Sequence, residues 1–302
     1  MNIESLKILV VGDIMLDKYV EGEVNRISPE SPVPIVEIKN EYSSLGGCGN
    51  VVRNLRELGA QVDCLSSVGY DRYGEIIKQK LIEIGAKPII LNGSETTTVK
   101  ERIIASERKV QMLRIDRESI KDVESSKVIK IFEDNSSNEY NMIVISDYAK
   151  GMITSNLMSY FKNYKNINII VDPKPQHVHM YNGVYMVTPN EKEWNQMMVS
   201  SPYTLNHVSY ILETKGSKGM KLIDCIQDTR IDIPSEEVQV SNVSGCGDVV
   251  IAVLAVCLSS TLIPLISAQI ANQCAGYTAS LPGTSVIPKN KFMKYLDNFI
   301  GG

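Results

Sequence analysis

Short runs of aliphatic residues recur along the chain, and the first, Ile8-Leu9-Val10-Val11, ends at Gly12-Asp13. A continuous β-branched and aliphatic run of this length predicts a strand buried on both faces. Comparable runs follow at residues 64–68, 142–145, 167–171, 184–187 and 210–212. Helical patterns lie between several of these runs, which is typical of βαβ units. We therefore predict an α/β fold with a mostly parallel sheet and helices on both faces.

Two stretches depart from this pattern because apolar and polar residues alternate in them. Val99 and Ile103, for example, alternate with Lys100 and Arg102. Alternation indicates a strand with one face in water or against a partner. We therefore predict a small β lid inserted into the main fold. The insertions are expected at about residues 19–44 and 95–116 of a single domain that spans residues 1–302.

The composition argues against several classes of protein. The 31 basic and 35 acidic residues are mixed along the chain and give a net charge of −4, so no block of one sign indicates a nucleic-acid or membrane partner. The six cysteines lack the short paired spacing of a zinc site, and three histidines are too few to complete one. The apolar run near the N-terminus is much shorter than a signal or membrane segment. We expect a cytoplasmic protein with free thiols.

The segment Ser244-Gly245-Cys246-Gly247-Asp248 is the strongest local signal. It opens a helical pattern that is apolar nearly all round, which predicts a central helix. Two glycines at such a helix start leave backbone N–H groups free to converge on an anion, and phosphate is the natural guest. Asp248 would lie beside this anion hole as a general base for an attacking hydroxyl. The alternative is an acid that only complements the helix dipole.

A second glycine cluster, Gly46-Gly47-Cys48-Gly49-Asn50, directly precedes a helical pattern that ends at Gly59. Backbone without large side chains suits sugar hydroxyls, and Asn50 offers both a donor and an acceptor. Asn50 could equally cap the helix. Asp13 ends the first strand, where open parallel sheets bind their ligands, although a plain turn aspartate is an equal reading.

Polar side chains also follow later strands, at the same edge of the predicted sheet. They are Asp147, Lys150, Lys174, Asn190 and Glu193. On the lid, Lys100 and Arg102 share one face and could hold a phosphate, the arginine bidentately. Each charge alone is more simply a solvated surface residue. The hypothesis of a ligand site therefore rests on their joint placement.

Together these motifs resemble the ribokinase-like (PfkB) carbohydrate kinases over nearly the whole chain. Gly46-Gly47 with Asn50 resembles the N-terminal signature of that family, and residues 245–248 resemble its C-terminal Gly-Ala-Gly-Asp. Asn190 with Glu193 resembles its Asn-x-x-Glu motif, and residues 214–219 resemble its nucleotide-side loop. The resemblance implies a three-layer sandwich with a β lid, and a sugar kinase that uses ATP and Mg²⁺.

The same resemblance divides the candidate residues by role. Asp248 is the catalytic base, next to the anion hole of Gly245, Cys246 and Gly247. The substrate-binding residues are Asp13, Gly46, Gly47, Asn50, Lys100, Arg102, Asp147 and Lys150. The nucleotide-binding residues are Lys174, Asn190, Thr214, Gly216, Gly219, Ser244 and Asn272, while Glu193 would act on Mg²⁺ through water. Asn242 replaces a carboxylate that helps to hold a monovalent cation in related kinases, which makes potassium activation doubtful.

Further segments are similar to the heptose 7-phosphate kinases within the family, namely residues 12–17, 26–30, 32–34 and 146–151. The similarity implies phosphorylation of the anomeric hydroxyl of D-glycero-D-manno-heptose 7-phosphate, which gives a 1,7-bisphosphate for the activated heptose of surface glycans. Many relatives carry a nucleotidyltransferase domain on the same chain. We expect none within residues 1–302, so that activity should reside elsewhere. Two lids pack together in relatives, so we expect a homodimer.

Two other interpretations stay open. One is a kinase of the same fold for another sugar or nucleoside, which differs in whether Lys100 and Arg102 face a substrate phosphate. The other is a sugar-binding or regulatory protein that has lost catalysis, as Asn242 and Ser244 could suggest. The retention of Asp248 and of the motif at residues 190–193 argues against that second alternative.

Overall fold

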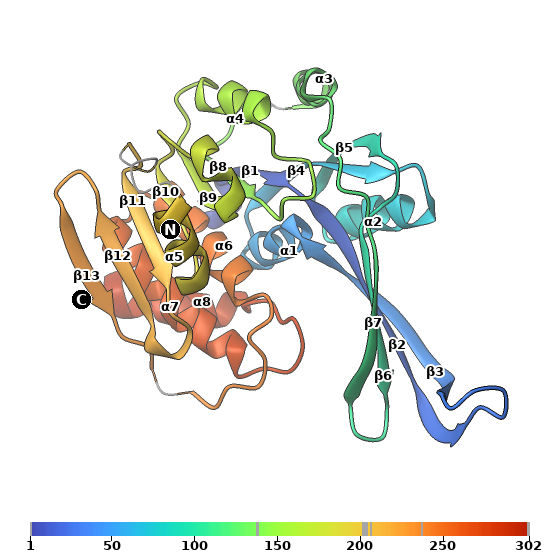
Figure 1. The fold of residues 1–302 in the computed structure, drawn as a ribbon. Coiled ribbons are helices and arrows are strands. Elements are labelled where there is room, and N and C mark those ends of the chain that lie inside the picture. The colour runs from blue at the N-terminus through green and yellow to red at the C-terminus, as the bar shows by residue number, and fades with distance from the viewer. Residues whose placement is uncertain (1, 137–138, 201–204, 206, 237, 301–302) are drawn as a thin grey trace.

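The computed structural model describes residues 2–136, 139–200, 205, 207–236 and 238–300. A large sheet is covered by helices on both faces, and a smaller sheet extends away from this body (Figure 1). The predicted α/β three-layer sandwich with a mostly parallel central sheet is confirmed.

Within the described part of the chain, the large sheet contains nine strands. In chain order they are β1 (Lys7–Gly12), β4 (Gln61–Gly69), β5 (Lys87–Ser94), β8 (Met142–Ser146), β9 (Ile169–Asp172), β10 (Met186–Val187), β11 (Tyr210–Thr214), β12 (Met220–Asp224) and β13 (Thr229–Ile233). Their spatial order is β13-β12-β11-β10-β9-β8-β1-β4-β5, and only the pairs β11–β12 and β12–β13 are antiparallel. The chain continues from β1 to β4 on one side and later places β8 on the other, so β1 lies at the switch point where open sheets bind ligands.

Helices form the two outer layers. One face is covered by α1 (Cys48–Leu58), α2 (Arg72–Glu83), α6 (Cys246–Ser259), α7 (Pro264–Ala279) and α8 (Lys289–Ile300), and the other by α3 (Ser125–Asn135), α4 (Ser155–Lys162) and α5 (Glu191–Ser200). Short 3-10 helices are η1 (Ile3–Ser5), η2 (Pro175–Met180) and η3 (Gly216–Lys218). Gly59 ends α1 in the left-handed region with φ of 103°, as predicted. Among the described residues, no helix combines the length and apolar character needed to cross a bilayer.

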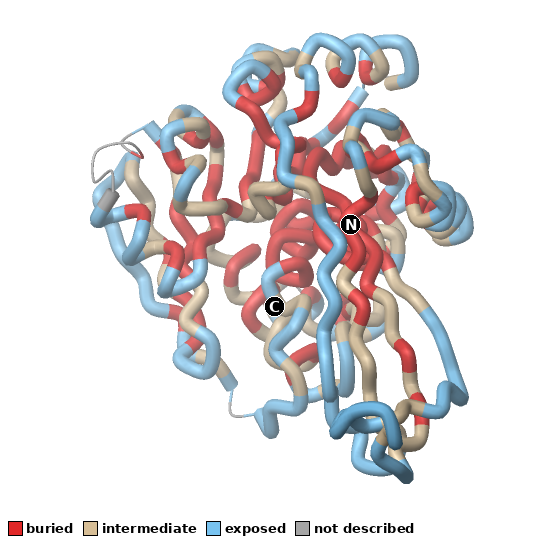
Figure 2. The backbone as a smooth tube through the Cα atoms, turned by 45° about the vertical axis from the view of Figure 1, so that its right-hand side comes forward, coloured by how far each residue is buried: buried red, intermediate tan, exposed pale blue. Residues whose placement is uncertain are grey.

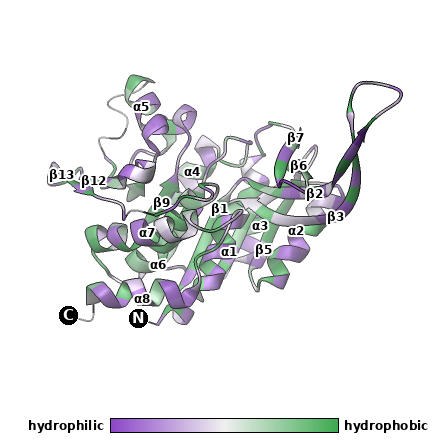
Figure 3. Cartoon of the chain, turned by 90° about the horizontal axis from the view of Figure 1, so that it is seen from below, coloured by the Kyte–Doolittle hydropathy of each residue, from purple (hydrophilic) through white to green (hydrophobic). Residues whose placement is uncertain are grey.

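The core consists of two apolar clusters, one on each side of the large sheet. Ile8 and Val10 of β1 belong to one cluster, and Leu9 and Val11 belong to the other, as the two-residue period of a strand requires. β1 is therefore buried on both faces, which its continuous apolar run predicts. Figure 2 shows the buried backbone gathered in the centre of the body, and Figure 3 shows the strands at the centre of the sheet in the green of hydrophobic residues.

The smaller sheet is the lid. It consists of β2 (Ile14–Ile27), β3 (Pro34–Gly47), β6 (Val99–Ala105) and β7 (Val110–Arg117), in the order β3-β2-β6-β7. Two antiparallel hairpins are joined by parallel pairing of β2 with β6. The first hairpin starts at Ile14, about five residues earlier than predicted, and β3 continues directly into α1. The lid therefore joins the body at the carboxyl end of β1 (Figure 1).

Candidate active site

Asp248 lies in the first turn of α6 and is almost fully buried, with 6% of its surface exposed. Its Oδ2 accepts a hydrogen bond from Nδ2 of Asn50 at 2.7 Å, and its Oδ1 accepts one from the hydroxyl of Tyr148 at 3.1 Å. Asn50 belongs to α1, and Tyr148 follows β8. The carboxylate is thus held in one orientation by two donors from distant parts of the chain.

Burial raises the pKa of Asp248 to about 6, because removal from water disfavours the charged form. The hydrogen bonds from Asn50 and Tyr148 act in the opposite direction, since they stabilise the carboxylate. The negative charge of Asp17 adds to the increase in pKa, and the positive charge of Lys174 reduces it. A carboxylate with this pKa is mostly ionised at pH 7 and still accepts a proton readily, which suits a general base.

The glycine pair before α1 allows the lid strand β3 to turn tightly onto the body. Gly47 has φ of 58°, in the left-handed region, and a Cβ atom there would lie 2.3 Å from the carbonyl oxygen of Asp13. A Cβ atom at Gly46 would lie 2.4 Å from Oδ2 of Asp17. A side chain at Gly47 would therefore clash with the backbone, and one at Gly46 would displace the carboxylate of Asp17. The turn places Asn50, the third residue of α1, in its buried position beside Asp248.

Asp13 is a buried carboxylate that holds the loop after β8. Its Oδ2 accepts hydrogen bonds from the backbone N–H groups of Tyr148 at 2.8 Å and Lys150 at 3.2 Å, and its Oδ1 accepts one from Met152 at 2.9 Å. Burial raises the pKa of Asp13, and these backbone donors oppose that increase. In this structure Asp13 positions the loop that carries Tyr148, and its predicted contact with a sugar stays a prediction.

Asp147 has no exposed surface in this structure, and its predicted contact with the substrate stays a prediction. One of its oxygens accepts a hydrogen bond from the backbone N–H of Ala149 at 2.7 Å. The other is bonded to Nδ1 of His177 and to the hydroxyl of Tyr181, each at 2.7 Å. Asp147 therefore anchors the loop after β8 to the segment after β9. A carboxylate directly after a buried strand gave no sequence signal to separate these two roles.

Two predicted substrate cations are paired with carboxylates of the chain itself. Nη1 of Arg102 lies 2.6 Å from Oδ1 of Asp17, and its guanidinium lies over the ring of Tyr19 at 5.3 Å from the centroid. Nζ of Lys150 lies 2.7 Å from Oε2 of Glu118. Either cation would have to share or exchange its partner to bind a substrate phosphate.

Lys100 is a half-buried lid cation without such a partner. Among the described residues, no carboxylate oxygen lies within 4.0 Å of its Nζ, which instead lies 5.9 Å from the ring centroid of Tyr148. Burial lowers the pKa of Lys100, and the charges of Arg114 and Lys150 act in the same direction, whereas the charges of Asp17 and Asp116 oppose the decrease. An anionic ligand would relieve both effects, so Lys100 is the lid cation best placed to receive one.

A cavity of about 740 Å³ lies next to the first turn of α6, within the size range of small-molecule sites. It is lined by five of the predicted nucleotide-binding residues, Asn190, Thr214, Gly216, Gly219 and Asn272, together with Cys246 and Gly247 of the predicted anion hole. Val238, Val240, Val243, Ala275 and Ala279 give it an apolar wall. Lys174 and Ser244 lie outside this lining, and the N–H of Ser244 is engaged in a turn by Oδ1 of Asn242 at 2.8 Å.

The start of α6 is open to a ligand. Gly245 enters the helix with φ of 85°, and no side chain of the described residues caps this N-terminus. A Cβ atom at Gly247 would point into open space. The N–H of Cys246, however, donates to the carbonyl of Val243 at 3.3 Å, so one of the three predicted anion-hole donors is already engaged. The helix dipole and the remaining N–H groups still favour an anion here.

Asn190 and Glu193 form a reciprocal cap at the start of α5. Oδ1 of Asn190 accepts from the N–H of Glu193 at 2.9 Å, and Oε2 of Glu193 accepts from the N–H of Asn190 at 3.1 Å. The other oxygen of Glu193 accepts from Nζ of Lys174. Asp172 lines the same cavity, and burial, with the negative charges of Asp248 and Glu193, raises its pKa well above the usual range. Two neighbouring carboxylates are oxygen donors that fit Mg²⁺, and a divalent charge would offset their mutual repulsion.

Comparison with known proteins shows the family to which this chain belongs. Residues 5–290 match the family described as "pfkB family carbohydrate kinase". The chain belongs to this family. It is therefore an ATP-dependent sugar kinase.

Curated relatives of this carbohydrate kinase include two that are called "Bifunctional protein HldE". The one from Desulfatibacillum aliphaticivorans is 35% identical over 314 residues, which cover 97% of this chain and 64% of the relative. The one from Aliarcobacter butzleri (strain RM4018) is 35% identical over 305 residues, with 95% and 64% covered. The chain thus spans about 64% of the length of these relatives.

Solved structures of pfkB-type kinases share the fold at low sequence identity. Phosphofructokinase-2 from Escherichia coli in complex with potassium superimposes with a TM-score of 0.77 at 15% identity, covering 96% of this chain and 98% of the other. Ribokinase from Thermotoga maritima gives a TM-score of 0.71 at 17% identity, covering 97% and 100%. At these identities the likeness establishes the fold alone.

Four residues of this kinase site were given no role from the sequence: Asp17, Arg53, Tyr148 and Asp172. Asp17 is itself buried on β2 and shares the face of Lys100, with which it is paired in register. Arg53 stands three positions after Asn50, the spacing that brings side chains together on a helix. Tyr148 and Asp172 follow β8 and end β9, at the sheet edge where the other candidates were expected.

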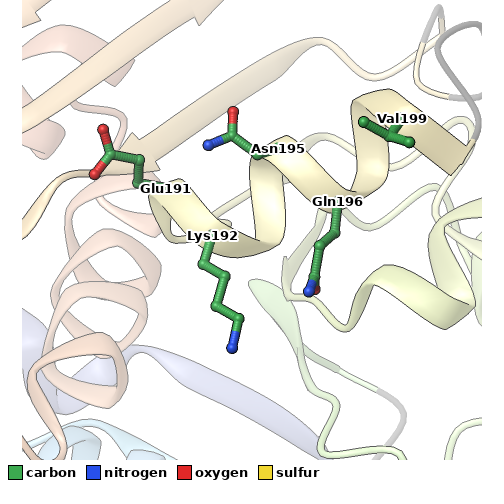
Figure 4. Close-up of a pocket in the computed structure, with 5 residues that line it drawn as sticks. All are labelled: Glu191, Lys192, Asn195, Gln196 and Val199. Atoms are coloured by element: carbon green, nitrogen blue, oxygen red, sulfur yellow. The ribbon is translucent and has the colours of Figure 1, made fainter.

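A separate open hollow of about 560 Å³ runs along α5. All of its lining residues, Glu191, Lys192, Asn195, Gln196 and Val199, come from this one helix (Figure 4). Glu193, on the same helix, is buried and lines the cavity beside α6 instead. A hollow built by a single helix face offers no converging groups, so it forms no part of the candidate site.

Proposed function

We propose that this carbohydrate kinase transfers the γ-phosphoryl group of ATP to the anomeric hydroxyl of D-glycero-D-manno-heptose 7-phosphate, giving the 1,7-bisphosphate used for activated heptose and surface glycans. The observation that carries the proposal is the position of Asp248. It is bonded to Asn50 from α1 on one side, and it directly follows the cavity-lining residues Cys246 and Gly247. The relatives called HldE support the heptose as the sugar.

Asp248 acts as the general base of this transfer. Its carboxylate accepts the proton of the anomeric hydroxyl while that oxygen forms a bond to the γ-phosphorus. The bond between the γ-phosphorus and the β,γ-bridging oxygen breaks, and ADP leaves with that electron pair. The N–H groups at the start of α6 stabilise the charge on the moving phosphoryl group. Asn50 and Tyr148 keep the carboxylate aimed at the hydroxyl.

The nucleotide occupies the cavity beside α6, with its base against the apolar wall and its phosphates toward Gly247. Glu193 and Asp172 would hold Mg²⁺, Glu193 through water, and the ion supplies neutralisation of phosphate charge. Lys174 already neutralises part of the local negative charge through its bond to Glu193.

The distal phosphate of the sugar lies under the lid. Lys100 is its first ligand, because it is half-buried and free of a carboxylate partner within 4.0 Å among the described residues. Arg102 contributes when it exchanges Asp17 for the phosphate. Two copies of the chain associate through the lid, because association would remove its exposed large apolar residues from water.

The pairing of Arg102 with Asp17 favours a second candidate function. A lid cation already neutralised within the chain suits a kinase that acts on a sugar without a distal phosphate. This second candidate would have the same fold and would differ from the proposal in its sugar substrate.

Turnover of ATP by the purified protein should be measured with the heptose 7-phosphate, with hexose phosphates and with unphosphorylated sugars, and the product identified by phosphorus NMR. The proposal expects a new anomeric phosphate on the heptose 7-phosphate and much weaker turnover of the others. Preferential phosphorylation of an unphosphorylated sugar would reject the heptose phosphate in favour of the second candidate.

A further inference from the structure

Asn50 is buried between the carboxylate of Asp248 and the guanidinium of Arg53. Its Nδ2 donates to Oδ2 of Asp248 at 2.7 Å, and its Oδ1 accepts from Nη1 of Arg53 at 3.0 Å. Only 1% of Asn50 is exposed. Each end of the amide is therefore committed to one protein partner.

The two partners allow only one orientation of the amide. An arginine carries donors and no acceptor, and an ionised carboxylate carries acceptors and no donor. If the amide of Asn50 rotated by half a turn, its oxygen would face Asp248 and its NH₂ group would face Arg53. Both contacts would then be repulsive, so Arg53 keeps the NH₂ group on the carboxylate.

Arg53 itself is held in an unusual environment for a surface helix. It is half-buried, and no carboxylate oxygen of the described residues lies within 4.0 Å of its guanidinium. Burial lowers its pKa, and the charges of Asp17 and Asp248 and the ring of Tyr19 act in the opposite direction. The guanidinium thus faces the same space as the catalytic carboxylate, and it adds a positive charge there.

We propose that Arg53 is a positioning residue for the phosphoryl transfer, which acts on Asp248 by fixing the amide of Asn50. This inference rests on the proposed role of Asp248 as the base. A substitution at Arg53 replaces none of the other titratable groups that lie near Asp248. They are Asp17 of β2, Tyr148 after β8, Asp172 and Lys174 around the end of β9, and Cys246 of its own helix.

Removal of Arg53 has a defined consequence for the carboxylate. Once Asp248 is protonated it can donate to a rotated amide oxygen, and without Arg53 nothing opposes that rotation. The protonated form is then favoured relative to the ionised form, and the lost positive charge acts in the same direction. The titration midpoint of Asp248 should therefore rise, on the order of one pH unit.

The test uses the ligand-free protein labelled with ¹³C at the carboxyl carbon of aspartate, titrated by NMR. The Asp248 signal is assigned by its loss in Asp248→Asn. Arg53→Met should raise the titration midpoint of Asp248 by about one pH unit. Arg53→Lys keeps the charge and a donor, so its midpoint should lie between those of Arg53→Met and the native protein. Arg56→Met is the matched control, because Arg56 on the same helix bonds the carbonyls of Ile84 and Ala60. The control should leave the midpoint unchanged.

Kinetics give the second readout. The acid limb of kcat should shift to higher pH in Arg53→Met by the same amount, with the KM for ATP unchanged.

An unchanged Asp248 midpoint would overturn the proposal. A rise in the KM for the sugar with an unchanged pH profile would also overturn it, since Arg53 would then be a substrate contact. If Arg53→Met does not fold, Arg53→Gln removes the charge and can present either amide atom, so the same shift is required. Because the titration needs no substrate, it gives its result even if the heptose assignment fails.

Discussion

Asp248 combines burial with two hydrogen bonds, and both features determine how its ionisation depends on pH. Burial alone would keep the carboxylic acid neutral, and the donors Asn50 and Tyr148 return part of the lost solvation. The resulting pKa of about 6 lies close to neutrality, so the carboxylate is mostly ionised at pH 7 and keeps its affinity for a proton. The effect of this pKa on turnover and its effect on the stability of the protein can be measured separately.

The pH dependence of turnover measures the first of these effects. The base must be ionised to accept a proton, so kcat should fall as pH decreases through about 6. An unburied aspartate would lose activity only near pH 4. The measurement is kcat between pH 5 and pH 8 at saturating substrates, with Tyr148→Phe as the companion variant. Loss of the Tyr148 hydroxyl should move the acid limb to higher pH, and an acid limb near pH 4 in the native protein would contradict the assignment.

The pH dependence of stability measures the second effect. The pKa of Asp248 is higher in the folded state, about 6 against 3.8, so the folded state binds the proton more tightly. Its contribution to stability is therefore fully present below pH 3.8 and is lost as pH rises through about 6, by roughly 3 kcal/mol in total. The difference in unfolding free energy between the native protein and Asp248→Asn should shift by most of this amount between pH 4 and pH 7, in favour of the variant. Urea denaturation at both pH values checks it, and a pH-independent difference would contradict the buried ionisation.

The glycine motifs at residues 46–50 and 244–248 indicated ligand sites at two helix starts, because glycines there leave the backbone accessible. The resemblance to the family then placed Asn50 and Asp248 in one site. The roles of single carboxylates were not predictable in the same way. Asp147, for example, is fully buried and bonded to His177 and Tyr181, and those partners come from a distant segment. Burial and pairing are tertiary properties, so a strand-end aspartate alone cannot reveal them.

At the scale of elements, the lid presents one cation to the substrate more freely than the others. Lys100→Met should raise the KM for a phosphorylated sugar by roughly 10- to 100-fold, since a hydrogen bond to a charged group contributes about 1.5–3 kcal/mol. The KM for ATP should stay unchanged. Lys39→Met is the matched control, because Lys39 lies farther along β3 and is paired with Glu37 at 2.9 Å. Equal effects of the two substitutions would mean that Lys100 contributes only to the general charge of the lid.

The opposite face of the lid tests the predicted dimer. Leu113 and Ile115 are exposed, and their positions on β7 pair with Ile103 and Glu101, away from the face of Lys100 and Arg102. The double variant Leu113→Ser, Ile115→Ser should shift the protein from dimer to monomer in sedimentation velocity at micromolar concentration. Ile120→Ser, an exposed position outside the lid strands, should leave the dimer intact. A native protein that sediments as a monomer would contradict the predicted association.

At the scale of the whole molecule, the site joins the two ends of the chain. Asp13 and Asn50 come from the first third, whereas Asp248 and Asn272 come from the last. The N–H of Ile287 also donates to Oδ1 of Asn54 at 3.1 Å, which ties the C-terminal region to α1. The alternation of apolar runs with helical patterns predicted this arrangement because every parallel strand ends at the same sheet edge. The bounds of the lid were less predictable, since β2 starts inside the core at Ile14 before it leaves the body.

Phosphoryl transfer by Asp248→Asn, compared with the native protein, tests the central claim most directly. Turnover with the heptose 7-phosphate and the dissociation constant of ATP should be measured on the same preparations. A base that acts only in the transition state predicts a loss in kcat of about 10²–10⁴-fold with ATP affinity nearly unchanged. Equal losses of turnover and of ATP affinity, or full turnover in the variant, would contradict the role of Asp248 as the base between sugar and nucleotide.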